Sequence, residues 1–526
     1  MKKQTVCLIV LLLAGSFLLR FAGLSSNPPG FFRDEADKGY TSYCLLQAGQ
    51  DQSGRSWPLF VQAMKVTTSA VYQYVDLPFI AALGLTEQAV RLPACLAGVL
   101  SVCASFLLAR SLWGTAAGLW AGLFVALSPW SLLLSRWANQ SILLTFSIPL
   151  GIYLFVRQKE RPFPSIHHSW AASCCFLLAL YTYAPARMYI PVFCVLIWLA
   201  SLSRVSLSRE HRRSFFLSGS IFFTVFAVGC IPLAHHLLYE SAESGARLSQ
   251  ITIHDGQSLF SMIREWIGNY FLHFSPGFLW IRGDENLRHS TALFGQLHIY
   301  LIPLILMGLV RALKTRSRID RILLIWLFMF PIASAFTRES IPHALRSVFA
   351  VPAFHVTAAY GLTAWREWRP CLEKRFSVDG VKAAVRLWTA ALILLPAIHL
   401  YDLFFQYPRY AAMDWEYGYK EAVEWWKTHR AEADSALVSG LAEYPYVFFL
   451  FYDEYPPEQW IARQRIDGVE FVPTGRPTQS VLNPEEGRVL YLLRPDELQM
   501  AMPDAVIQLP TGEAIWKWVA WGKRRE

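Results

Sequence analysis

The sequence has few charged residues and few cysteines for its length. Only 17% of its 526 residues are Asp, Glu, Lys or Arg, while 54% are hydrophobic, a balance that a soluble protein of this size could not easily solvate. The nine cysteines contain no CxxC pair and predict no disulfide framework. There is no internal repeat and no low-complexity segment. These absences leave a multi-spanning membrane protein as the leading class.

Long apolar runs recur along the first 400 residues. Eleven of them have about the twenty residues that cross the roughly 30 Å hydrocarbon core of a bilayer. The first also fits the template of a cleaved signal peptide, but it is long for that role. We therefore predict a polytopic α-helical membrane protein with about eleven transmembrane helices, at 5–24, 89–109, 114–132, 139–156, 169–185, 188–203, 214–237, 296–311, 322–337, 347–365 and 386–405.

The basic residues alternate along the chain. The formal net charge is +9, and clusters of Lys and Arg occupy every second connection between apolar runs, beginning with Lys2 and Lys3. Short cytoplasmic connections of membrane proteins carry an excess of Lys and Arg, so the positive charge indicates the topology of the chain. It predicts no nucleic-acid partner. The N-terminus is then cytoplasmic, and the long connections 25–88 and 238–295 face the outside, as does the chain after 405.

The tail, residues 406–526, has a different pattern. An amphipathic stretch, "YGYKEAVEWWKTHRAEA", predicts a helix. Turn-rich segments then separate four short runs that we predict as strands: "SALVSG", "YVFFLF", "GRVLYLL" and "DAVIQL". We expect a transmembrane domain at 1–405 and a small extracytoplasmic α/β domain at 406–526.

Two adjacent acids, Asp34 and Glu35 in "PPGFFRDEADKGY", lie just outside the first apolar run. Ionisable groups beside the membrane are costly and usually face a water-filled cavity, so they are functional candidates. The alternative is a solvated helix start, with Asp34 near the N-cap.

Basic residues on the outer face break the alternation described above. An anion would explain them, and Arg offers bidentate donors to a phosphate. Acids and cations converging on one pocket suggest a lipid-linked phosphate substrate, with one acid deprotonating an attacking hydroxyl and the cations stabilising the departing phosphate. These residues are Lys65, Arg91, Arg136, Arg187, Arg288, Arg338 and Arg346, with Asp284, Glu285, His289 and His343 nearby in the sequence.

Three segments carry a family resemblance. "PPGFFRDEADKGYTSYCLLQAGQDQSGRSWPLF", "VRLPACLAGVL" and "SPWSLLLSRWANQSILL" resemble bacterial membrane glycosyltransferases of family 39. That family belongs to the GT-C superfamily, with the protein O-mannosyltransferases and the aminoarabinose transferase that acts on lipid A. The resemblance covers about the first 400 residues. It implies an inverting transferase of the bacterial inner membrane that moves one sugar from a polyprenyl-phosphate carrier to an outer protein, lipid or wall polymer.

The resemblance also implies roles for particular residues. Asp34 becomes the catalytic base, and Glu35 assists it or orients the acceptor. For Arg136 and Arg187, pairing with a loop carbonyl or carboxylate is an equal alternative. The donor phosphate would meet Lys65, Arg338, His343 and Arg346, and the substrate cavity would include Arg136, Arg187, Trp57, Asp284, Glu285, Arg288 and His289.

A metal is a further option at Asp284, Glu285 and His289, which could join Asp34 around Mg²⁺, Mn²⁺ or Zn²⁺. The alternative is a loop that caps the substrate cavity. The resemblance implies that no metal is required, and the sequence contains no HExxH or DxD motif. We therefore expect no cofactor.

Two functions of other classes compete with an enzyme. A transporter or flippase for lipid-linked saccharides could use the same charges for binding, but such proteins usually place ionisable groups near the bilayer midplane and in duplicated halves. A receptor would depend on its tail, so deletion of 406–526 would abolish function.

Overall fold

The chain folds into two compact units in a computed structural model. The structure describes residues 3–64, 66–157, 166–202, 209–239, 253, 258–440, 444–473, 488–495 and 502–521. One unit comprises Met1–Ala22 and Ala94–Leu403, and the other comprises Gly23–Pro93 and Phe404–Glu526. The predicted first outer connection and the tail therefore belong to the same unit.

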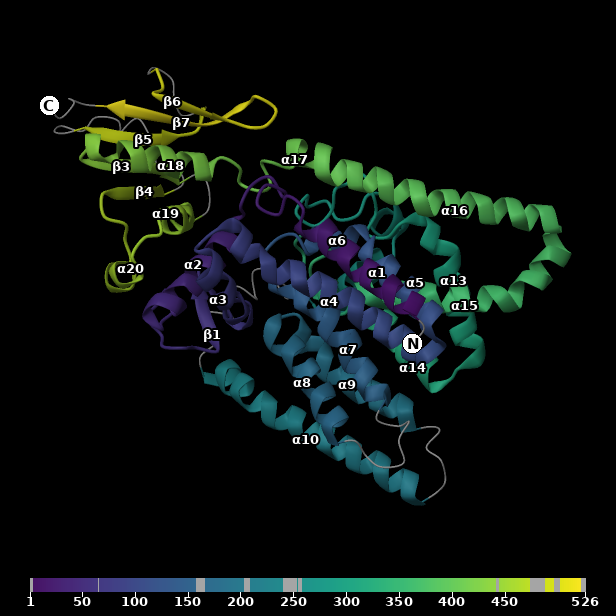
Figure 1. The fold of residues 1–526 in the computed structure, drawn as a ribbon. Helices are drawn as coiled ribbons and strands as arrows, with labels where there is room; N and C mark the ends of the chain where they lie inside the picture. The colour runs from purple at the N-terminus through teal and green to yellow at the C-terminus, as the bar shows by residue number, and fades with distance from the viewer. Residues whose placement is uncertain are drawn as a thin grey trace. The chain divides into compact units, whose positions relative to one another are not determined.

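The first unit is built mainly from α-helices (Figure 1). Each of the eleven predicted spans overlaps a helix of the described chain. The elements are α1 (Lys3–Phe21), α4 (Glu87–Trp113, which begins in the second unit), α5 (Thr115–Ala126), α6 (Pro129–Leu134), η1 (Gln140–Leu143), α7 (Leu144–Arg157), α8 (Ile166–Thr182), α9 (Ala186–Leu202), α10 (Arg209–Tyr239), α12 (Leu259–Leu272), η2 (Gly277–Ile281), η3 (Ile299–Leu301), α13 (Ile302–Thr315), α14 (Arg318–Met329), η4 (Ser334–Phe336), α15 (Ala350–Phe376) and α16 (Val378–Tyr401).

Several helices could cross a bilayer. By length and composition, six in the described chain qualify: Lys3–Phe21, Glu87–Trp113, Gln140–Arg157, Arg212–Tyr239, Arg318–Phe336 and Val378–Tyr410. Three more apolar helices, α3 (Val71–Leu83), α5 and α9, are shorter, at 10–17 residues. A multi-pass membrane protein is thus confirmed, while the number of eleven crossings stays a prediction.

Helices α13 and α15 pack closely through glycine. A Cβ atom on Gly361 would lie 1.9 Å from the carbonyl oxygen of Leu304, and one on Gly308 would lie 2.3 Å from that of Thr357. Only residues without a side chain allow the two backbones to approach this far. The sequence therefore specifies this helix crossing through two glycines.

The second unit combines helices with a five-stranded sheet (Figure 1). The strand order is β4-β3-β5-β7-β6, in which β3 runs parallel to β4 and β5, and β7 runs antiparallel to β5 and β6. Helices α18 and α19 pack against the sheet through ring contacts, Trp425 to Trp518 at 5.2 Å and Phe449 to Phe471 at 5.5 Å. The elements are α2 (Arg33–Ala48), β1 (Phe60–Ala63), β2 (Val66–Ser69), α3 (Val71–Leu83), η5 (Asp402–Gln406, which begins in the first unit), α17 (Tyr407–Tyr410), α18 (Tyr419–His429), η6 (Arg430–Glu432), β3 (Ser435–Gly440), α19 (Tyr446–Tyr452), α20 (Pro457–Arg463), β4 (Val469–Pro473), β5 (Val489–Leu493), β6 (Ala505–Gln508) and β7 (Ala514–Trp521).

One predicted strand of the tail is wrong. "YVFFLF" forms helix α19, whereas "SALVSG", "GRVLYLL" and "DAVIQL" contain the strands β3, β5 and β6, as predicted. Residues 447–451 are all buried, because α19 has neighbours on two sides, with Phe451 against Phe31 and Phe449 against Phe471. A short run without polar residues fits a buried helix as well as a buried strand, and here packing decided.

Candidate functional site

The two adjacent acids lie in the first turn of helix α2. The helix begins after Phe32, whose backbone N–H donates to the Glu35 carboxylate at 3.2 Å, and it ends at Gly49, whose φ of 66° is left-handed. An acid three residues into a helix commonly accepts this bond, which satisfies a backbone donor that would otherwise have no partner. The segment thus starts a helix, as its alternative interpretation held, but Glu35 is buried and not solvated.

Glu35 is fully buried in an ion pair with Arg91. The Arg91 Nε lies 3.0 Å from one Glu35 oxygen and its Nη2 lies 2.9 Å from the other, and neither side chain is exposed. Arg91 also donates to the carbonyl oxygens of Leu24 and Pro28, at 3.0 and 3.2 Å. The pair therefore fastens the segment before α2 to the start of α4. This position gives Glu35 a structural task, and its role toward the acceptor stays a prediction.

Asp34 has a different environment from its neighbour. Its side chain is half-buried, and within the described residues its carboxylate has no hydrogen bond or ion pair. Its backbone carbonyl accepts a bond of 3.1 Å from the buried ammonium group of Lys38. Successive helical residues point about 100° apart, so the two acids cannot face the same surroundings. Of the two, Asp34 is the carboxylate that remains available for chemistry.

Helix α2 carries a further acid that the sequence did not single out. Asp37 is buried, and burial raises the pKa of its carboxyl group from 3.8 to about 7, against the opposing effect of Lys38. The side-chain amide of Gln52 donates to its carboxyl oxygen at 3.1 Å. Asp37 lies in the same "RDEADKG" run as Asp34, and its one-turn spacing from Asp34 was the available signal.

Helix α3 presents two buried polar residues that were likewise missed. Asp76 and Gln73 are both unexposed, and their side-chain oxygen and nitrogen atoms have no hydrogen-bond partner in the described part of the chain. Burial raises the pKa of Asp76 well above its usual range, which favours a neutral carboxyl group. Helix α3 packs against α2, so the candidate base lies on a helix with an unusually polar, buried neighbour.

The turn after α2 explains part of the "GQDQSGRSWPL" run. The buried Asp51 carboxylate accepts bonds from the backbone N–H groups of Ser53 and Arg55, both at 2.9 Å. This turn leads to Trp57, a residue that is 58% exposed and whose ring stacks on that of Tyr74 with centroids 6.2 Å apart. Trp57 is thus an exposed aromatic surface in the unit that contains Asp34.

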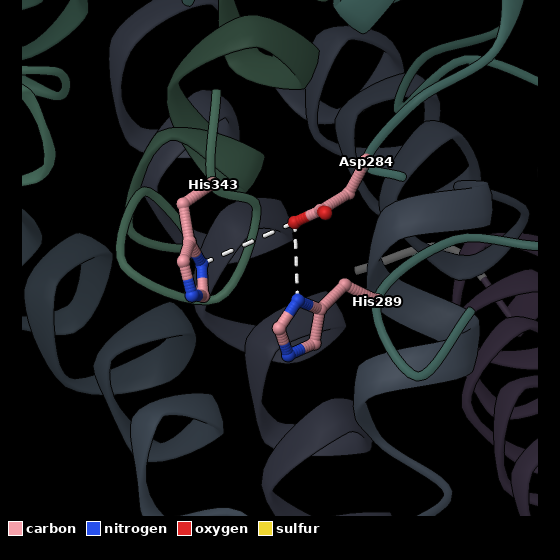
Figure 2. A group of neighbouring side chains, drawn as sticks. All are labelled: Asp284, His289 and His343. Atoms are coloured by element: carbon pink, nitrogen blue, oxygen red, sulfur yellow. Dashed lines mark hydrogen bonds and ion pairs between the residues drawn. The ribbon is translucent and has the colours of Figure 1, made fainter. Parts of the chain in front are cut away.

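The first unit has its own cluster of ionisable side chains. Figure 2 shows the Asp284 carboxylate directed toward the rings of His289 and His343. The distances from one carboxylate oxygen to the Nδ1 atoms are 3.0 Å for His289 and 4.0 Å for His343, and all three side chains are buried. The carboxylate also accepts the N–H groups of Asn286 and Ala344, at 2.9 and 2.7 Å. These bonds fix its orientation toward the two histidines.

This triad has the donor set of a divalent-metal site. One ligand atom from each residue lies within 4.8 Å of the others, and imidazole nitrogen with carboxylate oxygen suits Zn²⁺ or Mn²⁺. Burial lowers the pKa of His343 well below its usual range, and the neutral ring is the form that binds metals. The predicted set contained Glu285 and Asp34 and lacked His343. The Glu285 side chain is exposed, and neither of these two acids belongs to the cluster.

The other predicted cations of the first unit have varied surroundings. Arg338 pairs with Glu265 at 3.1 Å, and Arg346 pairs with Glu339 at 3.0 Å and donates to the Thr337 hydroxyl at 2.7 Å. Arg187, in the first turn of α9, and Arg288 are half-buried. Lys65, the fourth predicted phosphate contact, lies outside the described residues.

Arg136 has the structural environment that was the alternative to a substrate role. Its side chain is unexposed, and it donates to the carbonyl oxygens of Leu19, Arg20 and Ala22 at 2.8, 3.0 and 2.6 Å. These carbonyls lie at and just beyond the end of α1, where backbone acceptors have no helical partner. Arg136 therefore caps the first helix.

Part of the chain matches a known protein family. Residues 70–231 match the family model described as dolichyl-phosphate-mannose-protein mannosyltransferase. A comparison with curated proteins gave no match. The matched stretch includes α3 to α9 and most of α10.

Solved structures share the fold over nearly the whole chain. ArnT from Cupriavidus metallidurans in the apo state superposes with a TM-score of 0.56 and 13% identity, covering 98% of both chains. The same protein bound to undecaprenyl phosphate gives 0.54 and 13%, covering 97% of both. The oligosaccharyltransferase AglB from Archaeoglobus fulgidus, in complex with an inhibitory peptide and a dolichol-phosphate, gives 0.54 and 13%, covering 86% of this chain and 64% of AglB. The predicted fold class and the predicted resemblance to GT-C glycosyltransferases are confirmed.

Proposed function

We propose that the chain is an inverting glycosyltransferase that moves a single sugar from a polyprenyl-phosphate carrier to an acceptor outside the cell. The observation that carries this proposal is the state of the two acids on α2. Glu35 is neutralised by Arg91, whereas the adjacent Asp34 carboxylate is half-buried and has no partner within the described residues. The match to a mannosyltransferase family model and the shared fold with ArnT and AglB support the reaction class.

The reaction follows from one displacement. The Asp34 carboxylate takes the proton of the acceptor hydroxyl while that oxygen attacks the anomeric carbon of the donor. The bond between this carbon and the phosphate oxygen breaks, and the polyprenyl phosphate leaves with the electron pair and without a proton. A single attack from the face opposite the leaving group inverts the configuration of the sugar.

The leaving phosphate needs positive charge. Lys65, Arg338, His343 and Arg346 are the residues we propose for it, since guanidinium and ammonium groups stabilise phosphate oxygens. Glu265, the partner of Arg338, is 30% exposed, and Glu339, the partner of Arg346, is 65% exposed. An arriving phosphate would therefore compete with weakly held partners. His343 would act as a neutral donor.

We propose no metal in the chemical step. Metal bound at Asp284, His289 and His343 would hold together the loop at 284–289 and the segment before α15. We propose that the loop at 284–289 caps the substrate cavity, whether or not a metal is bound.

The proposed location is the bacterial inner membrane. The N-terminus is cytoplasmic in this proposal, and the tail domain lies outside, as the alternation of basic connections indicates. Proposed partners are the polyprenyl-phosphate sugar donor, membrane lipid, and an acceptor that is a protein, a lipid or a wall polymer.

The test compares cell envelopes with and without the gene. Mass spectrometry of envelope lipids, proteins and polymers is expected to show one missing monosaccharide in the deletion strain. The wild-type gene and the control Glu458→Gln, an exposed acid of α20, should restore it. Asp34→Asn should lower the transfer rate about 10²–10⁴-fold, the range for a general base. Full restoration of the monosaccharide by Asp34→Asn would contradict the proposed role of Asp34 as the base. If the deletion strain lacks no monosaccharide but distributes the lipid-linked carrier differently across the membrane, the protein is a flippase.

A further inference from the structure

A cavity of about 570 Å³ lies within the second compact unit. Its volume is within the roughly 300–1,000 Å³ of typical small-molecule sites. Its walls come from the turn after α2 and strand β1 on one side, and from α19, α20 and β4 of the tail on the other. The residues that determine its chemistry are Gln52, Gln62, Tyr446, Trp460, Gln464 and Phe471.

Aromatic rings form one part of this wall. The rings of Tyr446 and Trp460 stack with centroids 5.5 Å apart and planes 18° apart, and Phe471 meets Tyr446 edge-on at 6.3 Å. Aromatic side chains combine a flat apolar face with a polar edge. A pyranose ring has the matching surface, because one of its faces consists largely of C–H groups and its rim of hydroxyls.

Three glutamines form the polar part. Each side-chain amide has an oxygen that can accept from a hydroxyl group, whereas the N–H groups of Gln52 and Gln464 already donate within the protein. The Gln464 amide donates to the backbone carbonyl of Gln52 at 2.8 Å, so it joins the tail to the turn after α2. The Gln52 amide donates to Asp37, which leaves its own oxygen as an acceptor.

Trp460 lines the cavity without offering its donor to it. The residue is 6% exposed, and its Nε1 atom has less than 1 Å² of accessible surface and no hydrogen-bond partner in the described chain. A molecule in the cavity therefore meets carbon atoms of Trp460, which suits the C–H face of a sugar ring.

The charge at the cavity distinguishes its occupant from the phosphate donor. Arg465 and Glu470, of opposite sign, are the charged side chains among the described lining residues. A site for a phosphate would show an excess of cations. The lining is therefore suited to an uncharged, hydroxyl-rich molecule.

We infer that this cavity binds a short uncharged oligosaccharide, the part of the acceptor that precedes the sugar to be added. This identification of the saccharide as the acceptor rests on the proposed glycosyltransferase function. The cavity makes the tail domain an acceptor-selecting element, because α19, α20 and β4 supply its three aromatic residues.

The experiment measures binding directly on the full-length protein in detergent. The probes are a printed array of neutral oligosaccharides of two to four sugars and an array of short peptides. Wild type is expected to bind at least one neutral oligosaccharide. Trp460→Phe, which removes the five-membered ring of the indole together with its Nε1–H but keeps an aromatic face, should weaken that binding about three- to tenfold, because part of the stacking surface is lost. Gln62→Ala should weaken it similarly, and Gln459→Ala, an exposed glutamine of the same helix α20, should not change it.

Each contrary outcome overturns the inference. These are an absence of binding to any neutral oligosaccharide, equal binding by wild type, Trp460→Phe and Gln62→Ala, and capture of peptides in place of saccharides. Asp34→Asn separates the two proposals, since it should lose transfer and keep saccharide binding. If it keeps both, the assignment of Asp34 as the base fails while the saccharide site stands. If the wild type binds saccharide but transfers no sugar, the glycosyltransferase proposal fails alone. If it loses transfer but no variant binds saccharide, this inference fails alone.

Discussion

Two groups of ionisable side chains, one in each compact unit, are assembled in opposite ways. Asp34 and Glu35 are neighbours in the sequence, yet helix geometry separates them, so that one enters a buried ion pair and the other remains available. Asp284 and His343 are far apart in the sequence, yet two loops bring them together with His289. Neighbouring residues on a helix can therefore have different roles, whereas loops can bring residues that are distant in the sequence into one cluster.

The Glu35–Arg91 pair gives the largest expected effect on stability. Glu35→Gln should lower the free energy of unfolding by about 3–5 kcal/mol, because it leaves the Arg91 charge buried without its counterion. Thermal unfolding of the detergent-solubilised protein, followed by tryptophan fluorescence, measures it.

The matched control is Glu367→Gln, which breaks the exposed pair with Arg311 at 2.9 Å. That change should cost less than about 1 kcal/mol. If Glu35→Gln instead keeps the wild-type midpoint and loses transfer, Glu35 acts on the acceptor, and the division of roles on α2 is wrong.

A smaller effect is expected at Asp37, one turn along α2. The folded protein holds the Asp37 proton more tightly than the unfolded chain does, because burial raises its pKa from 3.8 to about 7. This contribution to stability is fully present below about pH 3.8 and is lost as the pH rises through 7.

Asp37→Asn cannot ionise, so it should unfold at a higher temperature than wild type at pH 8 and at a similar temperature at pH 4. We expect a gain on the order of 1–3 kcal/mol at pH 8. Thermal midpoints across this pH range provide the measurement, with Glu458→Gln as the control. Parallel curves for wild type and Asp37→Asn would show that Asp37 ionises normally.

The smallest effect is expected from metal removal at the triad. Transfer after treatment with EDTA should stay within about twofold of the untreated rate, because the proposed chemistry uses Asp34 and cations. The assay follows the sugar identified by envelope mass spectrometry. Loss of transfer that Zn²⁺ restores in wild type, but not in His289→Ala, would show that the triad holds a metal needed for the reaction.

Much of the membrane architecture could be predicted from local sequence. Each predicted span overlaps a helix, because the hydropathy of a twenty-residue window is a local property. The run 446–451 failed because its burial on two sides depends on α2 and the sheet, which are distant in the sequence. The candidate base, Asp34, was identified from its position beside the first span. The sequence did not predict that Arg91 would pair with Glu35 and not with Asp34, because Arg91 and Glu35 are 56 positions apart.

The order of residues alone determined the apolar segments, the start of helix α2 and the presence of acids beside the first span, because these depend on hydropathy, helix periodicity and end effects over a few residues. Tertiary structure alone decided that Glu35 is bound by Arg91, that Arg136 caps α1, and that His343 takes the place of Glu285 beside Asp284. Ion pairs and ligand clusters act over a few ångströms, and only the folded chain brings distant residues within that range.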